Sequence, residues 1–234
     1  IELTLRKRYA DNWQLLTSYT WQKLEGNYDG LFQNSTGQLD PNINSAFDYG
    51  DFLVNAYGRL TNERRHQVKV DGSYTLSGKA EGLTLGTSIR VYSGYPQTAY
   101  GYSFLYANWE YYLTPRGSLG TDPVEWEGDL HVGYPIKIGA KANANIIVDV
   151  FNLFNRQAIT SYDQRYNLAN HGSCGGIPDN LCNHDNGLQH APNSINPIGQ
   201  LSNVAANAPN PDFLKAGVAF SGQRSIRLGI RFTF

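Results

Sequence analysis

The fold is decided by residues 223–234, which read QRSIRLGIRFTF. Every second position is apolar, and this set is Ile226, Leu228, Ile230, Phe232 and Phe234. Between them stand Ser225, Arg227, Gly229, Arg231 and Thr233. Successive side chains of a β-strand point to opposite faces, whereas a helix repeats every 3.6 residues. The stretch therefore predicts a strand with one apolar and one polar face.

The same alternation recurs along the chain and predicts an all-β protein of seven or so strands. The strands are expected near residues 1–9, 13–23, 65–76, 83–93, 125–138, 143–160 and 223–234. Short turns near residues 10–12, 77–82 and 139–142 would join neighbours as antiparallel hairpins. Ile147, Phe151 and Leu153 fall on the otherwise polar face of their strand, which indicates a packed element on that side.

The remaining connections are long, near residues 24–64, 94–124 and 168–222. Compact soluble domains rarely carry several such loops, whereas outer-membrane barrels combine short periplasmic turns with long extracellular loops. Aromatic residues also gather near the expected strand ends, as interfacial girdles do. These residues are Tyr9 and Trp13 beside a short turn, with Trp21, Tyr92 and Tyr95 toward the long loops. The pattern favours a transmembrane antiparallel β-barrel over a soluble β-sandwich, which has the same alternation.

Seven strands are too few, and odd in number, for such a barrel. An open sheet in lipid would leave backbone N–H and C=O groups unpaired at several kcal/mol each. The chain begins at Ile1, contains no Met and has no recognisable signal peptide. We therefore expect the remaining strands to come from sequence upstream of Ile1.

Bulk composition and motifs exclude several functions. The formal charge of -1 and pI of about 6.6 provide no basic surface for nucleic acid. The chain has no run of about 18 apolar residues that would form a membrane helix. Nucleophile–base pairs, phosphate loops and HExxH motifs are also absent, so the sequence predicts neither an enzyme nor a cofactor.

Several stretches closely resemble the C-terminal strands of TonB-dependent outer-membrane receptors, particularly the Oar-like proteins. They are IELTLRKRYADNWQLLTSYTW (1–21), YSGYP (92–96), PRGS (115–118), DVFNLFNRQ (149–157) and RSIRLGIRFTF (224–234). DVFNLFNR and the aromatic strand ending in Phe234 are fairly specific when they occur together. The resemblance covers most strand regions, and beyond YSGYP and PRGS the long loops show none.

The resemblance implies a bacterial outer-membrane protein whose barrel has about 22 strands, of which this chain supplies the last seven or so. It also implies an N-terminal plug and a short box that engages TonB, both outside this chain. Outer-membrane lipid and the barrel-assembly machinery are the other implied partners. Residues 226–234, including Ile226, Leu228, Ile230, Phe232 and Phe234, would be the signal that this machinery reads.

The longest loop contains two cysteines and a group of potential metal ligands. Cys174 and Cys182 lie close together in an envelope protein that meets an oxidising compartment, which predicts a disulfide. The surrounding His171, His184, Asp185 and His190 match no standard metal site, and a solvated polar loop is the simpler interpretation. Nearby Asp179, Asn180, Asn183 and Asn186 lack the calcium-loop pattern with a closing Glu.

An aromatic run lies between residues 100 and 112. Its members are Tyr100, Tyr102, Phe104, Tyr106, Trp109 and Tyr111. These side chains form a candidate ligand-contact surface, because aromatic faces bind apolar groups with little loss of entropy. The structural alternative is a paired β-ribbon held by cross-strand aromatic contacts.

The polar face of the expected sheet carries charges of both signs. They are Arg6, Arg8, Lys69, Arg90, Arg227 and Arg231 with Glu2, Asp71, Asp129 and Asp149. A mixed-sign wall fits a plugged lumen better than an ion-selective pore, which presents one sign at its constriction.

Two functions follow from these observations. The first is the barrel portion of a TonB-dependent transporter that imports a scarce solute. The second is a surface-exposed adhesion or assembly protein that uses residues 100–112 and 167–222 on a barrel scaffold.

Replacing Cys174 with Ser tests the disulfide. We expect the barrel to stay intact and only the 168–222 loop to loosen, because closing so small a ring contributes roughly 2 to 3 kcal/mol to loop order alone. Limited proteolysis of the full-length receptor, with Ser173→Ala as control, measures this. Loss of the whole fold would show that the cysteines were assigned to the wrong part of the molecule.

Overall fold

The computed structural model describes residues 1–33, 40–41, 43–48, 50–103, 108–139, 142–166, 210–217 and 219–233. These residues form three antiparallel sheets and two short 3₁₀ helices, η1 (Gly50–Leu53) and η2 (Gly78–Ala80). Among the described residues, no helix is long and apolar enough to cross a membrane. The fold is therefore all-β, as the alternation predicted.

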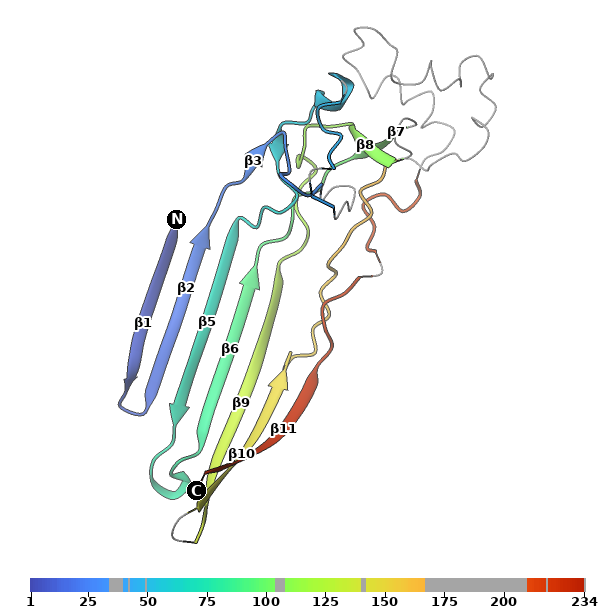
Figure 1. Cartoon of the computed structure of the whole chain (residues 1–234). Coiled ribbons are helices and arrows are strands. Elements are labelled where there is room, and N and C mark those ends of the chain that lie inside the picture. The colour runs from blue at the N-terminus through green and yellow to red at the C-terminus, as the bar shows by residue number, and fades with distance from the viewer. Residues whose placement is uncertain are drawn as a thin grey trace.

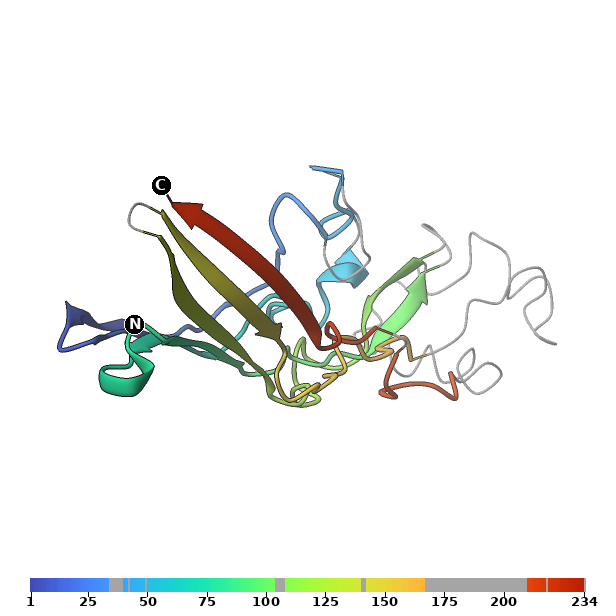
Figure 2. The same ribbon diagram turned by 90° about the horizontal axis from the view of Figure 1, so that it is seen from below.

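The main sheet has seven strands in the order β1-β2-β5-β6-β9-β10-β11. Their bounds are β1 Glu2–Ala10, β2 Trp13–Trp21, β5 His66–Thr75, β6 Thr84–Tyr92, β9 Glu125–Ile138, β10 Ala142–Phe151 and β11 Ser225–Thr233. The hairpin turns lie at one end of the sheet and the long connections at the other (Figure 1). The sheet is bent, with β9, β10 and β11 rising from the level of the other strands (Figure 2). It does not close on itself, and β1 and β11 are its edges.

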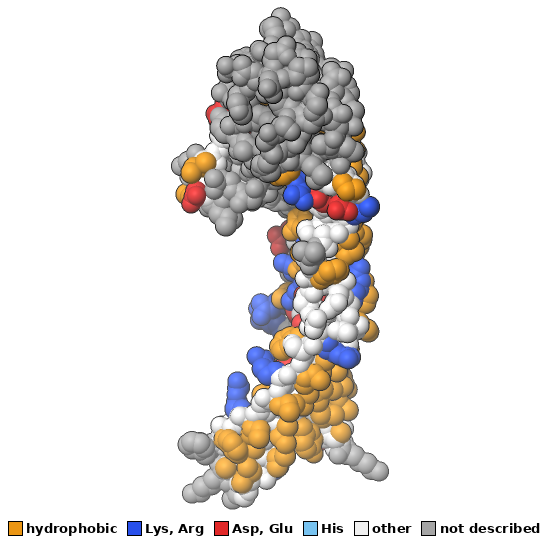
Figure 3. All heavy atoms as spheres, turned by 90° about the vertical axis from the view of Figure 1, so that its right-hand side faces the viewer, with side chains coloured by type: hydrophobic (Ala, Val, Ile, Leu, Met, Phe, Trp, Pro, Cys, Tyr) orange, Lys and Arg blue, Asp and Glu red, His pale blue; other side chains and the backbone are white. Residues whose placement is uncertain are grey.

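Strand register aligns the apolar positions of all seven strands on one face. One row crosses the sheet from Tyr74 through Leu85, Val132 and Val148 to Leu228. Many of these side chains are uncovered, and Leu228 at the β11 edge is 75% exposed. Figure 3 shows an orange apolar surface on one side of the sheet and blue Lys and Arg side chains on the other. Among the described residues no second sheet covers the apolar face, which contradicts the β-sandwich alternative.

Polar residues within the apolar face satisfy their own hydrogen-bonding groups. The Thr17 hydroxyl donates to the Lys69 carbonyl and the Thr87 hydroxyl to the Asp129 carbonyl, both at 3.1 Å. Near the first turn, Lys7 lies over the Trp13 ring and donates to the Ala10 carbonyl. This arrangement avoids unsatisfied donors on a surface that could not obtain them from hydrocarbon.

The DVFNLFNR segment forms a sharp corner at the end of β10. The expected strand near 143–160 is too long, because Asn152 takes φ 48° and ends β10 at Phe151. The Asn152 amide group donates to the carbonyls of Arg156 and Gly222, and its backbone N–H donates to Asp129. The corner thereby ties β9, β10 and the approach to β11 together.

The long connections contain ordered structure beyond the ends of the main strands. The first carries β3 (Glu25–Gly26), η1 and β4 (Gly58–Arg59), and the second carries β7 (Tyr100–Ser103) and β8 (Asn108–Tyr112). Phe52 packs with Tyr111 and Leu113 in a small buried core between the two connections. We call the described parts of residues 24–65 and 93–124 the outer loop unit. The loop that carries η1 extends over the inside of the bend (Figure 2).

Leu228→Arg tests whether the apolar face meets lipid. A cation on the lipid side of a barrel strand costs about 2–4 kcal/mol at the bilayer midplane, so insertion and the denaturant midpoint should fall. Gly229→Arg is the matched control, since it adds the same cation to the opposite face, where its Cβ would lie 3.8 Å from that of Ile147. Unfolding of the full-length receptor in lipid vesicles measures both. Equal losses in the two variants would contradict the assignment of faces.

Candidate functional site: the concave wall and the outer loop unit

The polar face of the main sheet is hollowed. A depression of about 860 Å³ runs from β1 to β10 and is lined mainly by polar-face side chains. Its charged and imidazole lining residues on the polar face are Arg6, Arg8, Asp71, Asp129, His131 and Asp149. We call this hollowed polar face the concave wall. It presents groups of both signs, as the sequence predicted.

Two clusters on the wall are paired across neighbouring strands. Arg90 on β6 donates to Asp71 on β5 at 2.8 Å. Asp149 on β10 accepts from Arg227 on β11 at 2.7 Å and lies 2.6 Å from His131 Nδ1 on β9. The second cluster joins three strands, and it depends on register. Sequence alternation placed these residues on one face, but it gave no indication that His131 would meet Asp149.

The other cations of the wall have no carboxylate partner in the described part of the chain. They are Arg6, Arg8, Lys69, Lys137 and Arg231, of which Arg6 and Arg8 are exposed on β1. Glu2 and Glu127 are the corresponding anions without a partner. Asp129 belongs to the DVFNLFNR corner, because it accepts the backbone N–H of Asn152 at 2.9 Å. The wall therefore combines closed ion pairs with charges that remain available to another surface.

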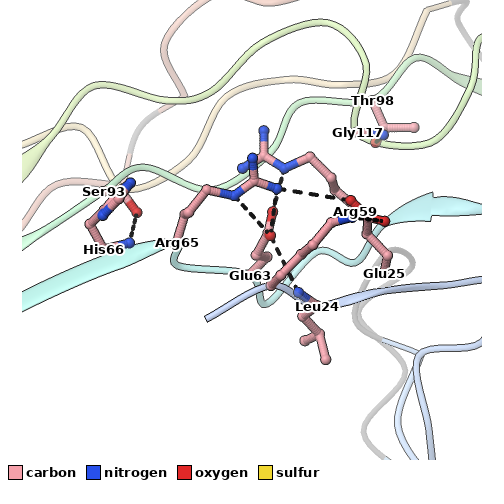
Figure 4. Close-up of polar contacts among 10 residues, drawn as sticks. Leu24, Glu25, Arg59, Glu63, Arg65, His66, Ser93, Thr98 and Gly117 are labelled. Atoms are coloured by element: carbon pink, nitrogen blue, oxygen red, sulfur yellow. Dashed lines mark hydrogen bonds and ion pairs between the residues drawn. The ribbon is translucent and has the colours of Figure 1, made fainter. Parts of the chain in front are cut away.

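A buried carboxylate organises the base of the outer loop unit. The Glu63 side chain is fully buried and accepts hydrogen bonds from Arg59, from Arg65 at 2.9 Å and from the Leu24 backbone N–H at 3.3 Å (Figure 4). Burial alone would raise the pKa of Glu63, but these hydrogen bonds outweigh it and leave the pKa below its ordinary value. Arg65 also reaches Glu25 of β3. Glu63 thus connects both ends of the first long connection.

A second buried pair joins the first connection to the next. Arg116 donates to Asp29, and both side chains are almost inaccessible to solvent. The two backbones approach closely at this point, because a Cβ on Gly58 would lie 2.1 Å from the Arg116 carbonyl oxygen. Only glycine fits there. The PRGS stretch is therefore a structural junction between the two loops.

Aromatic side chains near the outer end of the sheet divide between its faces. Trp21 and Trp126 lie on the apolar face, as an interfacial girdle requires. Tyr92 is paired with Gln67 and Glu125 on the polar face, and Arg64 stacks over the rings of Tyr92 and Tyr95. The prediction that Tyr92 and Tyr95 belong to the lipid-facing girdle is wrong, because register and Arg64 hold them on the wall side.

The predicted aromatic run is the β7–β8 ribbon. Tyr100 and Tyr111 are 4% and 2% exposed, and each packs in a small core of the outer loop unit. Burial raises the pKa of the Tyr100 hydroxyl. Trp109 is half-buried beneath Arg165. Nothing is described of the Tyr102 side chain, Phe104 or Tyr106, so ligand contact by this run stays a prediction.

The segments that flank the longest loop pair with each other. Leu214 donates its backbone N–H to the Asp163 carbonyl at 2.6 Å, and Tyr162 bridges to Ala216. Hydrogen bonds from Arg165 lower the pKa of Asp163 to about 2. Cys174, Cys182, His171, His184, Asp185 and His190 lie outside the described residues. Within the described ranges, no group of three or more His, Cys, Asp or Glu residues could hold a metal ion.

The strand predicted to act as the assembly signal forms the β11 edge. Ile226, Leu228, Ile230 and Phe232 are all exposed on the apolar face. Phe234 lies outside the described residues. Recognition of this strand by the assembly machinery stays a prediction.

Glu63→Gln tests whether the buried carboxylate holds the outer loop unit. Because the folded-state pKa of Glu63 is lowered, its contribution is present above its ordinary pKa of 4.5 and is lost as the pH falls further. At neutral pH the variant should weaken local stability by about 2–3 kcal/mol, since two half-buried guanidinium groups lose their common buried anion.

Hydrogen exchange of residues 24–26 and 58–65 in the full-length receptor measures this change. Glu2→Gln, which removes an exposed carboxylate from β1, is the matched control and should leave exchange unaltered. Unchanged protection in Glu63→Gln would show that the buried carboxylate does not hold these loops.

No known family profile matches the chain. Over 240 aligned residues it is 35% identical to the TonB-dependent transporter Oar of Myxococcus xanthus, and the match covers 100% of this chain and 22% of that protein. The chain thus spans 22% of the length of this relative. The relative is a transporter and not an enzyme, which confirms the prediction made from the lack of catalytic motifs.

Among solved structures, the chain is similar to the ferripyoverdine receptor of the outer membrane of Pseudomonas aeruginosa bound to ferripyoverdine. The TM-score is 0.41 at 20% identity, and the match covers 69% of this chain and 16% of the receptor chain. The resemblance predicted from the strand motifs is confirmed by the similarity to Oar along the whole chain. The chain belongs to the Oar-like TonB-dependent receptors of the bacterial outer membrane.

Proposed function

We propose that this chain forms part of the barrel wall of a TonB-dependent transporter that imports a scarce solute. The observation that carries the proposal is the division of one sheet into two opposed surfaces. The apolar face has its side chains uncovered, and the opposite face is hollow and charged. A soluble protein would bury the first surface, whereas a transporter wall places it in lipid and turns the second toward the transport path.

The remaining barrel strands and a plug are part of the same proposal. The edges β1 and β11 expose unpaired backbone groups, which cost several kcal/mol each in lipid unless further strands cover them. By resemblance the complete barrel has about 22 strands. Arg6, Arg8 and the other unpaired charges of the concave wall suit contact with a charged plug surface, and TonB would act on the plug from the periplasm.

A second candidate is a surface role in adhesion or assembly. The observation that favours it is a set of exposed apolar side chains on the outer loop unit, which are Tyr28, Leu31, Phe32, Ile43, Phe47 and Tyr57. Tyr28 and Phe47 contact each other with ring centroids 5.6 Å apart. Exposed apolar side chains of this kind fit a macromolecular partner or an apolar solute equally well. Import and surface attachment differ in their dependence on TonB.

Solute depletion from the medium tests the transport proposal. Cells producing the full-length receptor are grown beside cells without it and cells whose receptor cannot engage TonB. Mass spectrometry of the spent medium should show at least one solute depleted only when receptor and TonB engagement are both present. Heat-modifiable gel migration confirms that the receptor has formed its barrel in each strain.

The result that contradicts transport is a correctly folded receptor with no TonB-dependent depletion. If surface attachment is then lost on deletion of the receptor but not on loss of TonB engagement, the adhesion role replaces it.

Arg6→Glu combined with Arg8→Glu adds a test of the wall, because reversing these charges should slow depletion while barrel formation persists. Lys23→Glu in the outer connection is a control for a charge reversal away from the wall.

A further inference from the structure

The apolar face ends, at the outer side, in an aromatic cluster of Trp126 and Phe154. Their rings meet edge to face with centroids 5.4 Å apart. Phe154 also packs on Gly128 of β9, where a Cβ added to the glycine would lie 3.2 Å from the Phe154 ring. Phe154 is 62% exposed and Trp126 is 38% exposed. Because Trp126 and Gly128 lie in the apolar rows of β9, this cluster continues the apolar face.

Arg156 stands over this cluster, and a second arginine, Arg224, has its backbone bonded to the neighbouring residue Asn155. The Arg156 guanidinium lies 5.2 Å from the Trp126 ring centroid, and its Nη2 donates to the Val124 carbonyl. Arg224 directly precedes β11, two residues before Ile226, so continued alternation would put its side chain on the same outward side as Ile226 and Leu228. The Arg224 backbone N–H donates to the Asn155 side chain, next to Arg156 in the chain. The DVFNLFNR corner therefore brings the two residues together.

Neither arginine has a carboxylate partner in the part of the chain that the structure describes. In this respect they differ from the other described cations at the outer end of the sheet. Lys23, Arg59, Arg64, Arg65, Arg116, Arg165 and Lys215 are each ion-paired. One buried donor of Arg156, Nη1, has no hydrogen-bond partner. The charge of this pair is thus not neutralised by the outer loop unit.

The acidic residues of neighbouring strands also point away from the pair. Register places Glu125, Glu127, Asp129 and Asp149 on the concave wall, on the opposite side of the sheet. The pair is therefore outside the transport path and at the upper boundary of the lipid-facing surface.

We infer that Arg156 and Arg224 bind the phosphate of an anionic lipid in the outward-facing leaflet. The apolar rows below them, with Trp126 and Phe154, would receive the acyl chains. The Arg156 guanidinium lies at the outer end of the apolar face, where such a lipid carries its phosphate, and arginine binds phosphate through charge-assisted hydrogen bonds. Continuity with the apolar face favours a lipid over a soluble phosphate, which would gain nothing from the aromatic cluster. The inference rests on the outer-membrane placement of the chain and not on the transported solute.

Native mass spectrometry of the purified full-length receptor tests this inference, with phosphatidic acid as the probe lipid. Arg156→Gln combined with Arg224→Gln should weaken phosphatidic acid binding by roughly five-fold per arginine, while phosphatidylcholine binding changes little. Arg6→Gln combined with Arg8→Gln removes the same charge from the concave wall and should leave lipid affinity within about two-fold of the wild type, since interactions beyond a Debye length are screened. Arg156→Lys combined with Arg224→Lys should restore part of the affinity.

Unchanged phosphatidic acid binding in the glutamine pair would overturn the inference, as would equal losses in the pair and in the wall control. Competition by inorganic phosphate as strong as that by the lipid would identify a soluble-anion site instead. Arg224→Gln alone guards against misfolding, because no hydrogen bond or ion pair of this side chain is present in the described residues. TonB-dependent depletion of solutes should be unaffected by the glutamine pair, which separates failure here from failure of the transport proposal.

Discussion

The structure depends on one constraint, which is that a strand surrounded by lipid must hydrogen-bond every backbone group to a neighbouring strand. Antiparallel pairing meets this requirement within the main sheet, and it fixes the register at the same time. Once the register is fixed, each strand can place only alternate residues in lipid. A slip by one residue would move Arg227 and Asp149 into lipid and Ile226 and Leu228 to the wall. The hydrogen-bond ladder and the division of faces are therefore one arrangement.

The same constraint explains the irregular parts of the sheet. The Thr17 and Thr87 hydroxyls bond to strand carbonyls, so neither threonine presents a free donor to lipid. At the end of β10, where pairing stops, Asn152 supplies its side-chain amide to backbone carbonyls that have left the ladder. The asparagine can do this because it tolerates a positive φ, which also turns the chain. The DVFNLFNR motif thus has a direct structural reason.

Sequence alternation predicts the seven main strands, their two faces and the position of the short turns, apart from the end of β10, because periodicity reports local backbone geometry. It could not predict contacts that depend on which residues become opposite each other. His131, Asp149 and Arg227 are far apart in the chain, and they meet only through the register of β9, β10 and β11. Tyr92 was assigned to the lipid side because aromatic residues at strand ends are common there. The register places Tyr92 opposite Gln67 on the polar face, and Arg64 lies over its ring. Tyr92 therefore lies on the concave wall.

The outer loop unit limits where an opening motion can occur in the proposed transporter. Its two connections share the buried Asp29–Arg116 pair and an approach at Gly58 too close for any side chain. Separating them would break the only ion pair that either charge makes in the described residues, which is costly for a buried pair. The unit should therefore move as one body with the rim of the sheet. Passage of a solute would then depend on movement of the plug against the concave wall. Arg6 and Arg8, which have no carboxylate partner within the wall, could form and break contacts with the plug without unfolding a strand.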